Sequence, residues 1–372
     1  MSADLNPSNN SNVDQQPIPI SDAMPHRKVL RSWLQELIER STPRALLLIV
    51  VDYLIYFALM AGAIAAPHWT LRLLSGLLCG FWIGRLFILG HDACHHSYTP
   101  SRALNRVLGR LAFLPSLSAY SLWEVGHNVV HHGFTNLKGT DFVWEPKSKE
   151  EYDAMSPSRK LMERIYRSGW GPSLYYVVEI WWGKMFFPSK DKKPGNRPAF
   201  LWDNVLVSVY AAIWLAVVVF GAMAADVAIW SAVLTAFVVP FLFWNGMIGW
   251  VVYMNHTHPN IAWYDDKRAW AAAQPFVTTT VHLTFKRNFG SVMHHIMEHS
   301  AHHLDMSIPL YKLKEAQERL EHLLPGRIVV QAFSWRFYFS TARTCKLYDF
   351  KNRRWTDFKG QATTDSVMVV NP

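Results

Sequence analysis

Hydrophobic positions gather in four long runs, arranged along the chain as two pairs. The first pair covers residues 46–66 and 71–89, and the second covers residues 205–225 and 227–254, which contain no charged residue. At about 1.5 Å of rise per residue, a helix over each run is long enough to cross roughly 30 Å of hydrocarbon. The pattern therefore predicts four transmembrane helices in two hairpins, with a buried helix of a soluble core as the alternative for each run.

Two charges interrupt the first pair of runs, Asp52 and Arg85. In antiparallel spans they come to similar depths, and intramembrane charges usually pair or serve a site. We therefore predict an Asp52–Arg85 ion pair. The alternative is that the Arg85 side chain reaches back toward the membrane interface.

Composition supports a membrane protein. Charged residues make up 17% of the chain and hydrophobic residues 50%, with a formal net charge of +9, whereas soluble domains carry about 25% charged residues. No nucleic-acid motif is present, so the basic balance indicates anionic lipid or an acidic partner. The cysteines, Cys79, Cys94 and Cys345, have no zinc or redox spacing and predict no disulfide.

The basic residues also predict an orientation. Lys and Arg are frequent before residue 46, between 91 and 200 and after 284, but are almost absent from the turns within the hairpins. The positive-inside rule then places both termini and the central loop in the cytoplasm, in an inner or plasma membrane. The predicted fold is all-α, with two hairpins under a cytoplasmic helical cap over residues 26–360. Residues 1–25 and 361–372 are predicted to be tails, the first of them disordered.

Candidate chemistry lies in three histidine boxes that contain nine of the 17 histidines. They read His91-Asp-Ala-Cys-His95-His96, His127-Asn-Val-Val-His131-His132 and His299-Ser-Ala-His302-His303. Residues three or four apart share a helix face, so we expect His91 with His95, His127 with His131, and the third box on one stripe with His295. His256, at the end of the last run, is a further candidate ligand.

So many imidazoles exceed the needs of one metal and predict two. Zinc sites close with four ligands or leave one position open. Copper often recruits sulfur, which Cys94 could supply, whereas non-haem iron takes imidazole and leaves positions for oxygen. The donor set therefore favours iron, with an apolar wall from the spans.

The boxes and their surroundings resemble those of the membrane fatty acid desaturases, in the acyl-lipid, ω-6-type branch. Further similarities are 126-GHN-128, 141-DFVWEP-146 and 255-NHTHP-259, and the tail segments 347-LYDF-350 and 355-WTDF-358 are similar to bacterial members. The resemblance implies two iron ions, O₂ as co-substrate and a double bond formed in a fatty acyl chain on a lipid, CoA or a carrier protein. It implies as ligands His91, His95, His127, His131, His132, His256, His299, His302 and His303, with His96 and His295 as further candidates.

Box two has one more intervening residue than the plant-type pattern, which leaves open whether His127 or Asn128 faces the metal. Trp123 and Trp144 flank this box and are candidates for shaping a substrate tunnel, with ordinary packing as the alternative. The resemblance also implies an electron donor such as a ferredoxin, a rubredoxin or a cytochrome b5-like protein. Lys351, Arg353 and Arg354 are candidates to attract it, unless they bind anionic lipid.

Other functions fit the same boxes. A fatty acyl hydroxylase, epoxidase or acetylenase begins with similar chemistry, and carotenoid or alkane oxygenases share histidine boxes. A metal transporter or an electron carrier belongs to another class. Transporters place ligands at the bilayer midplane, whereas these boxes lie beyond the ends of the runs.

Overall fold

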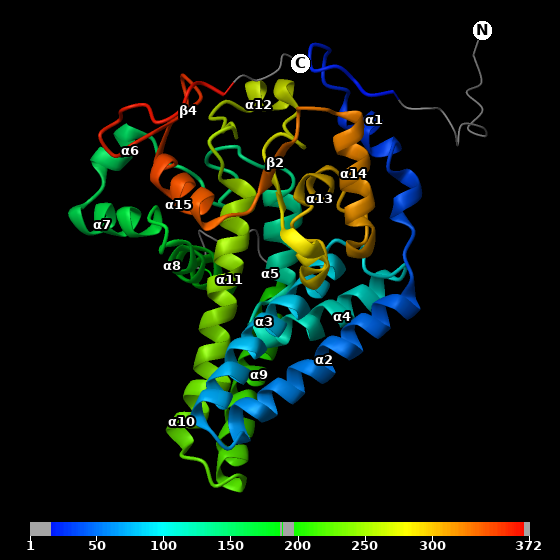
Figure 1. Ribbon diagram of the computed structural model, residues 1–372, viewed down its shortest axis with the longest axis vertical. Helices are drawn as coiled ribbons and strands as arrows, with labels where there is room; N and C mark the ends of the chain where they lie inside the picture. Colours follow the sequence, from blue (N-terminus) through cyan, green and yellow to red (C-terminus); the bar gives the residue numbers. More distant parts are fainter. Residues whose placement is uncertain (1–15, 187, 189–196, 368–372) are drawn as a thin grey trace.

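Four long apolar helices form one end of the molecule, and shorter elements form a cap at the other end (Figure 1). The computed structural model describes residues 16–186, 188 and 197–367. The long helices are α2 (Thr42–Ala65), α3 (Trp69–Cys94), α9 (Pro198–Ala224) and the continuous stretch Ile229–His256. By length and composition each can cross a membrane. The prediction of four spans in two hairpins is therefore confirmed.

The helices extend beyond the apolar runs that predicted them. α2 begins four residues before residue 46, where the Ser41 side chain caps the backbone N–H of Arg44, and Pro43 occupies the first turn. α3 continues five residues past residue 89 and carries the first histidine of box one, His91. Hydropathy marks the part of a helix that lies in hydrocarbon, whereas capping and tertiary packing decide where the helix ends.

α3 is the central helix of the bundle and α9 the most peripheral. In their most apolar windows 56% of α3 is buried within the protein, against 22% of α9. α3 approaches its neighbour through glycine: a Cβ on Gly76 would lie 2.1 Å from the Thr235 carbonyl oxygen. Small residues allow this close backbone approach between membrane helices.

The fourth span is one helix with a widened turn. It comprises α10 (Ile229–Val233), a π-helical segment η5 (Leu234–Val238) and α11 (Val239–His256). Pro240 follows the widened turn. A proline has no N–H to donate and its ring crowds the preceding turn, and π-bulges commonly absorb such misfits.

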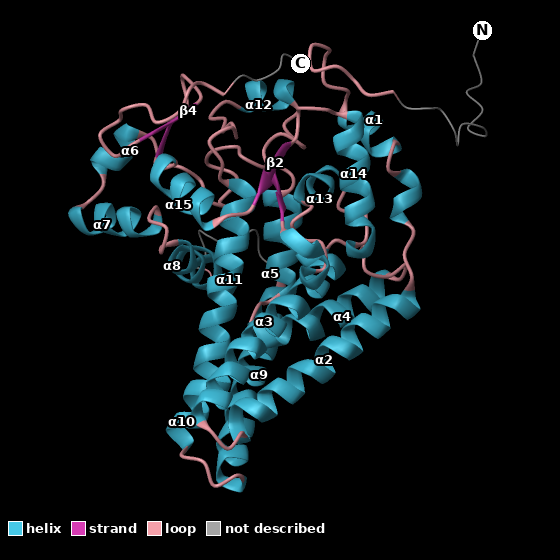
Figure 2. Cartoon of the chain, viewed as in Figure 1, coloured by secondary structure: helices cyan, strands magenta, loops and turns pink. Residues whose placement is uncertain are grey.

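The cap contains short helices and two small sheets (Figure 2). Between the hairpins lie α4 (Arg102–Phe113), η2 (Leu114–Ser116), α5 (Tyr120–Val125), η3 (Gly126–His131), α6 (Lys149–Ala154), α7 (Pro157–Tyr166), α8 (Pro172–Tyr175) and η4 (Tyr176–Phe186). Around the last box lie α12 (Lys267–Ala273), β1 (Val281–Thr284), η6 (Lys286–Met293), α13 (His299–Leu304), η7 (Leu310–Lys312) and α14 (Leu313–Leu323). The strands are few, so the mainly helical prediction is confirmed.

The sequence pattern predicted no helix or strand in the C-terminal region, whereas the structure contains both. They are β2 (Val329–Ala332), α15 (Trp335–Thr344), β3 (Leu347–Asp349) and β4 (Arg354–Thr356). β2 pairs in parallel with β1, and β3 pairs antiparallel with β4. Strands this short carry too little alternation of polar and apolar positions to be found by periodicity.

The described parts of both predicted tails contact the cap. The Ile18 N–H donates to the Leu323 carbonyl at 2.9 Å, and Arg327 donates to the Pro19 carbonyl at 2.6 Å. At the other end the Thr363 N–H donates to the Trp355 carbonyl at 2.9 Å. Before α2 the chain forms α1 (Arg27–Ser32) and η1 (Gln35–Ile38). Residues 1–15 and 368–372 of the predicted tails lie outside the described residues.

The predicted ion pair between the first two spans is confirmed. The Arg85 Nε donates to Asp52 Oδ1 at 2.9 Å, and Nη2 lies 3.3 Å from Oδ2. The same carboxylate lies 2.8 Å from His294 Nε2, and Arg85 also donates to the Val292 carbonyl. The pair therefore ties the loop before box three to α2 and α3.

A double-mutant cycle measures this pair. Asp52→Asn should cost about 3 kcal/mol of stability, because it leaves the Arg85 guanidinium buried without its carboxylate. The double variant Asp52→Asn/Arg85→Gln should lose much less stability than the sum of the losses in the two single variants, measured by thermal unfolding in detergent. Arg72→Gln, at the hairpin turn, is the control and should add its cost independently. Additive costs for Asp52→Asn and Arg85→Gln would show that the two side chains do not interact.

Candidate metal centre

Nine histidines from four segments converge into two adjacent buried groups. In each group the candidate ligand nitrogens lie within 4.8 Å of one another. The first group is His91, His95, His127, His132 and His302, and the second group is His131, His256, His299 and His303. The groups touch: the rings of His132 and His303 stack with centroids 4.1 Å apart. The arrangement offers two metal positions side by side.

Box one supplies two members of the first group from the end of α3. His91 lies in its last turn and His95 caps it, so their Nε2 atoms lie 3.3 Å apart, on the shared face that the spacing predicted. His96 belongs to neither group. Its backbone is left-handed, with φ of 56°, and its Nε2 turns to Glu124 Oε1 at 3.2 Å.

Box two is wound as a π-helix, which changes the predicted pairing. The His132 N–H donates to the His127 carbonyl five residues earlier, at 2.9 Å. The wider turn brings His127 and His132 together, with Nε2 atoms 3.1 Å apart, and sends His131 to the second group. The prediction that His127 and His131 face one metal is wrong, because it assumed 3.6 residues per turn.

The sequence left open whether His127 or Asn128 faces the metal, and the structure places both side chains. Its Nδ2 donates to the Cys94 carbonyl at 2.8 Å. His127 Nε2 instead lies 2.7 Å from His91 Nε2. His127, not Asn128, is the residue that faces the first group.

Box three divides between the two groups. His302 joins the first group, whereas His299 and His303 join the second, although all three lie on the short helix α13. His256, at the end of α11, completes the second group, with its Nε2 3.0 Å from His299 Nε2. The three histidines lie on one short helix, as expected. Their rings nevertheless contribute to two different groups, because the two groups lie side by side.

His295 lies outside both groups. It follows η6 with a left-handed backbone, φ of 59°, and its Nδ1 lies 2.8 Å from Glu298 Oε1. The segment from His294 to Glu298 is therefore not a turn of helix continuous with α13. The expectation that His295 projects from the same side as His299 required such a helix.

Burial favours the neutral form of six imidazoles at the site. Removal from water is the largest effect on His95, His127, His132, His302 and His303, and it holds the pKa of each well below its usual value, with neighbouring histidines adding to the effect. It also lowers the pKa of His299 to about 3. Neutral imidazole is the form that binds metals.

The donor atoms fit a metal at each group. Among the described residues, His302 Nε2 and His303 Nε2 are buried without a hydrogen-bond partner, although buried polar groups are normally paired. The closest Nε2–Nε2 distances within the groups are 2.7–3.3 Å. Cis ligands with metal–nitrogen bonds of roughly 2.1 Å lie about 3 Å apart. Imidazole nitrogens alone fill both groups, which suits iron better than sulfur-seeking metals.

The second group is held by partners that the sequence did not reveal. Asp141 Oδ1 lies 2.9 Å from His131 Nδ1, and the Asn136 N–H donates to Asp141 Oδ2 at 2.9 Å. Thr135 Oγ1 lies 3.1 Å from His303 Nδ1. Carboxylate and hydroxyl partners fix the tautomer and direction of a ligand ring. Asp141 begins the 141–146 motif noted above, but nothing in its spacing showed that it meets His131.

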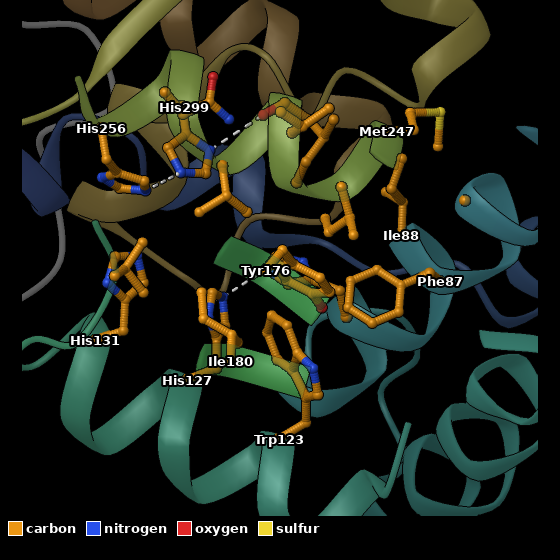
Figure 3. Close-up of a pocket in the computed structure, with 18 of the residues that line it drawn as sticks. Phe87, Ile88, Trp123, His127, His131, Tyr176, Ile180, Met247, His256 and His299 are labelled. Carbon is orange, nitrogen blue, oxygen red and sulfur yellow. Dashed lines mark hydrogen bonds between the residues drawn. The ribbon is translucent and has the colours of Figure 1, made fainter. Parts of the chain in front are cut away.

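An apolar cavity opens onto both groups (Figure 3). The empty space in and around it, which includes open solvent at its mouth, is about 730 Å³, and it is bordered by α3, α5, η4 and α11. The histidines lie at one end, and Phe87, Ile88 and Met247 lie at the other. Trp123 lines this cavity, whereas Trp144 does not and stacks on Tyr175 with centroids 4.3 Å apart. The amide of Asn255 also borders the cavity, and its nitrogen and oxygen have no partner among the described residues.

Asp141→Asn should weaken metal binding at the second group. The amide keeps the shape of the carboxylate but removes the charge that orients His131, which typically costs about 10–100-fold in metal affinity. Titrating metal-free protein with Fe²⁺ should show one weakened and one unchanged site. Asp153→Asn, an exposed carboxylate of α6, is the control. Two unchanged sites in Asp141→Asn would mean that the carboxylate does not support the metal.

Known proteins match the chain over most of its length. The family model for fatty acid desaturase matches residues 67–335. The chain is 25% identical to the chloroplastic omega-6 fatty acid desaturase of Spinacia oleracea, over 95% of this chain and 76% of the relative. It is 28% identical to the sn-1 oleoyl-lipid 12-desaturase of Picosynechococcus sp., over 77% and 79%. It is 30% identical to the sn-1 acyl-lipid omega-3 desaturase (ferredoxin) of Synechocystis sp., over 74% and 76%. The chain belongs to the fatty acid desaturase family and is a fatty acyl desaturase, an oxidoreductase of lipid metabolism.

Proposed function

We propose that the two histidine groups each hold one iron ion and that the enzyme uses O₂ to form a C=C bond in a lipid-linked acyl chain. The observation that carries this proposal is the meeting of nine buried imidazoles with one apolar cavity. When bound, the iron ions supply the activation of O₂ that an unactivated C–H bond requires. The nine histidines of the two groups are the proposed ligands, and His96 and His295 are not among them.

The protein's own contribution is placement and exclusion of water. The cavity walls are aliphatic and aromatic, so they bind an acyl chain by removing its methylene groups from water. The apolar lining of the cavity continues to the histidines, where the Trp123 ring packs on the His127 ring with centroids 4.3 Å apart. Two neighbouring carbons held at this end are positioned for oxidation, and a shift of about 1 Å can cost a hundredfold in rate.

Relatives support the choice of substrate and donor. Two of them are named for acyl-lipid or oleoyl-lipid substrates, and one is named with ferredoxin. We infer that this enzyme also takes an acyl chain on a membrane lipid and electrons from a small iron–sulfur carrier. The excess of Lys and Arg around the boxes supports a cytoplasmic active site in an inner or plasma membrane, with both termini on that side.

Expression in a host that lacks polyunsaturated lipids tests the reaction. Lipids that gain a double bond, and so lose two hydrogens by mass spectrometry, support desaturation; lipids that gain an oxygen atom would indicate a hydroxylase or epoxidase. Separate analysis of lipid, CoA and carrier-protein fractions identifies the acyl carrier. His302→Ala should abolish the product, because His302 points an unpartnered nitrogen into the first group. His322→Ala, on the exposed face of α14, is the control. A product that persists in His302→Ala would contradict the ligand assignment.

The far end of the cavity should control the position of the new bond. A Cβ added at Gly84 would lie 1.8 Å from the Met247 methyl, the flexible end of a side chain that can move into the cavity. In Gly84→Ala the methyl end of the substrate should reach less deeply, which moves the double bond about one or two carbons toward the methyl end. Met247→Ala added to Gly84→Ala should restore the original position, measured by mass spectrometry of the fatty acid esters. Identical products from all three enzymes would place the end of the substrate elsewhere.

A further inference from the structure

A small apolar cluster, separate from the main core, covers the second group. Its buried members are Leu137, Ala262, Tyr264 and Trp270, and Phe134 and Phe276 pack against it. Trp270 lies on α12 and is 7% exposed. In Figure 1, α12 lies at the end of the molecule opposite the hairpin turns. We call this the roof cluster.

Trp270 is joined to a candidate metal ligand by two hydrogen-bonded contacts. Its indole Nε1 donates to the Thr135 carbonyl at 2.9 Å, and Thr135 Oγ1 lies 3.1 Å from His303 Nδ1. The same hydroxyl donates to the His131 carbonyl at 2.8 Å. One residue, Thr135, therefore separates the Trp270 indole from a ring of the second group. Electron tunnelling falls steeply with distance and passes better through covalent and hydrogen bonds than through gaps, so this connection is suited to electron transfer.

Cations surround the roof cluster. The Lys267 ammonium lies 5.2 Å from the Phe134 ring centre, the Arg353 guanidinium 5.6 Å from Tyr264, and the Arg27 guanidinium 4.2 Å from Phe276. Arg268 is exposed on α12. Asp265 and Asp266, which precede the helix, and Asp365 are exposed carboxylates among the described residues. Asp266 caps α12 and accepts from the Ala269 N–H at 2.7 Å. The four cations named here outnumber these three carboxylates, and Lys267 and Arg268 are exposed side by side on α12.

We propose that the exposed surface over the roof cluster, around Lys267 and Arg268, is the docking surface for an acidic one-electron carrier, and that electrons pass from it through Trp270 and Thr135 to the second group. This inference rests on the proposed function. In each turnover the carrier would deliver two electrons one at a time, and the acyl chain would lose two electrons and two protons. O₂ takes up these four electrons and, with two further protons from water, leaves as two molecules of water. The indole bridges the path and is not itself consumed.

The position of the cluster favours a protein over a lipid surface as the occupant. The four spans define where the membrane lies, and α12 is at the other end of the molecule. Basic patches attract acidic carriers and speed their association, and electron-transfer complexes have small, weak interfaces. Of the cations predicted for this role, Arg353 lies on the cluster. Arg354 instead pairs with Asp349 at 3.3 Å, and Lys351 is exposed on the adjoining β3–β4 turn.

The test uses full-length, iron-loaded enzyme in nanodiscs and a plant-type ferredoxin as the probe. Its first measurement needs no turnover: the affinity of oxidised ferredoxin at low salt. Lys267→Glu/Arg268→Glu should weaken it about tenfold, because two attractive charges become repulsive, and high salt should remove the difference. Arg336→Glu/Arg343→Glu, two exposed arginines of α15, is the matched control and should change it little. An equal effect of both pairs would overturn the docking surface, as would a change only in binding to phosphatidylserine vesicles.

The second measurement tests the path. Trp270→Phe keeps an aromatic ring in the cluster but loses the hydrogen bond to Thr135. Ferredoxin affinity should remain, while the ratio of ferredoxin-driven to dithionite-driven desaturation falls several-fold, because dithionite is small and needs no docking. An unchanged ratio would overturn the path. If the wild-type enzyme forms no alkene even with dithionite, the proposed function fails, but the ferredoxin affinities still decide the docking surface.

Discussion

The structure depends on keeping nine imidazoles buried and convergent. Burial strips the hydration that a charged ring needs and holds the pKa of His127 and His302 well below the usual value, which favours their neutral, metal-binding form. Nine imidazole rings do not attract one another strongly enough to assemble, and the surrounding helices must hold them in place. α3 and α11 serve as rigid supports because each ends at the site, with His91 in the last turn of one and His256 at the end of the other. The packing of the spans therefore also determines how the histidines of the two groups are placed.

Local patterns predicted the nine histidines that the structure brings together, along with His96 and His295, which lie apart, but did not predict the group to which each one belongs. The apolar runs gave the spans, and the doubled spacing of the boxes gave the candidate ligands. The division into two groups depends on the π-helical winding of box two. There the His132 N–H donates to the His127 carbonyl, so the His132 ring lies beside the His127 ring and the His131 ring joins the other group. Spacing alone cannot distinguish these windings. The left-handed backbones at His96 and His295 are fixed by contacts with Glu124 and Glu298, which short-range patterns do not report.

The two groups differ in how the protein supports them. His131, His299 and His303 of the second group each have a polar partner for the remaining ring nitrogen, in Asp141, the Ile296 carbonyl and Thr135. Among the described residues, His95 Nδ1 and His132 Nδ1 of the first group have no partner, and in the second group His256 Nδ1 has none. A hydrogen-bonded carboxylate raises the electron density of a ligand, whereas an apolar wall controls access of solvent. The two groups therefore have different polar surroundings, and in the described part of the chain it is the second group that contacts Thr135.

The close approach of α3 to the fourth span packs the membrane helices and also shapes the apolar cavity. Gly76, Gly80 and Gly84 lie four residues apart on α3, so they form one stripe along the fourth span. At Gly76 and Gly80 the absent side chains allow contact with backbone oxygens of η5 and α11, whereas at Gly84 the space is filled by the Met247 methyl. One face of α3 thus changes from a packing surface to a cavity wall within a single turn. We therefore expect changes at Gly76 and Gly80 to act on the packing of the two helices, and a change at Gly84 to act on the shape of the cavity.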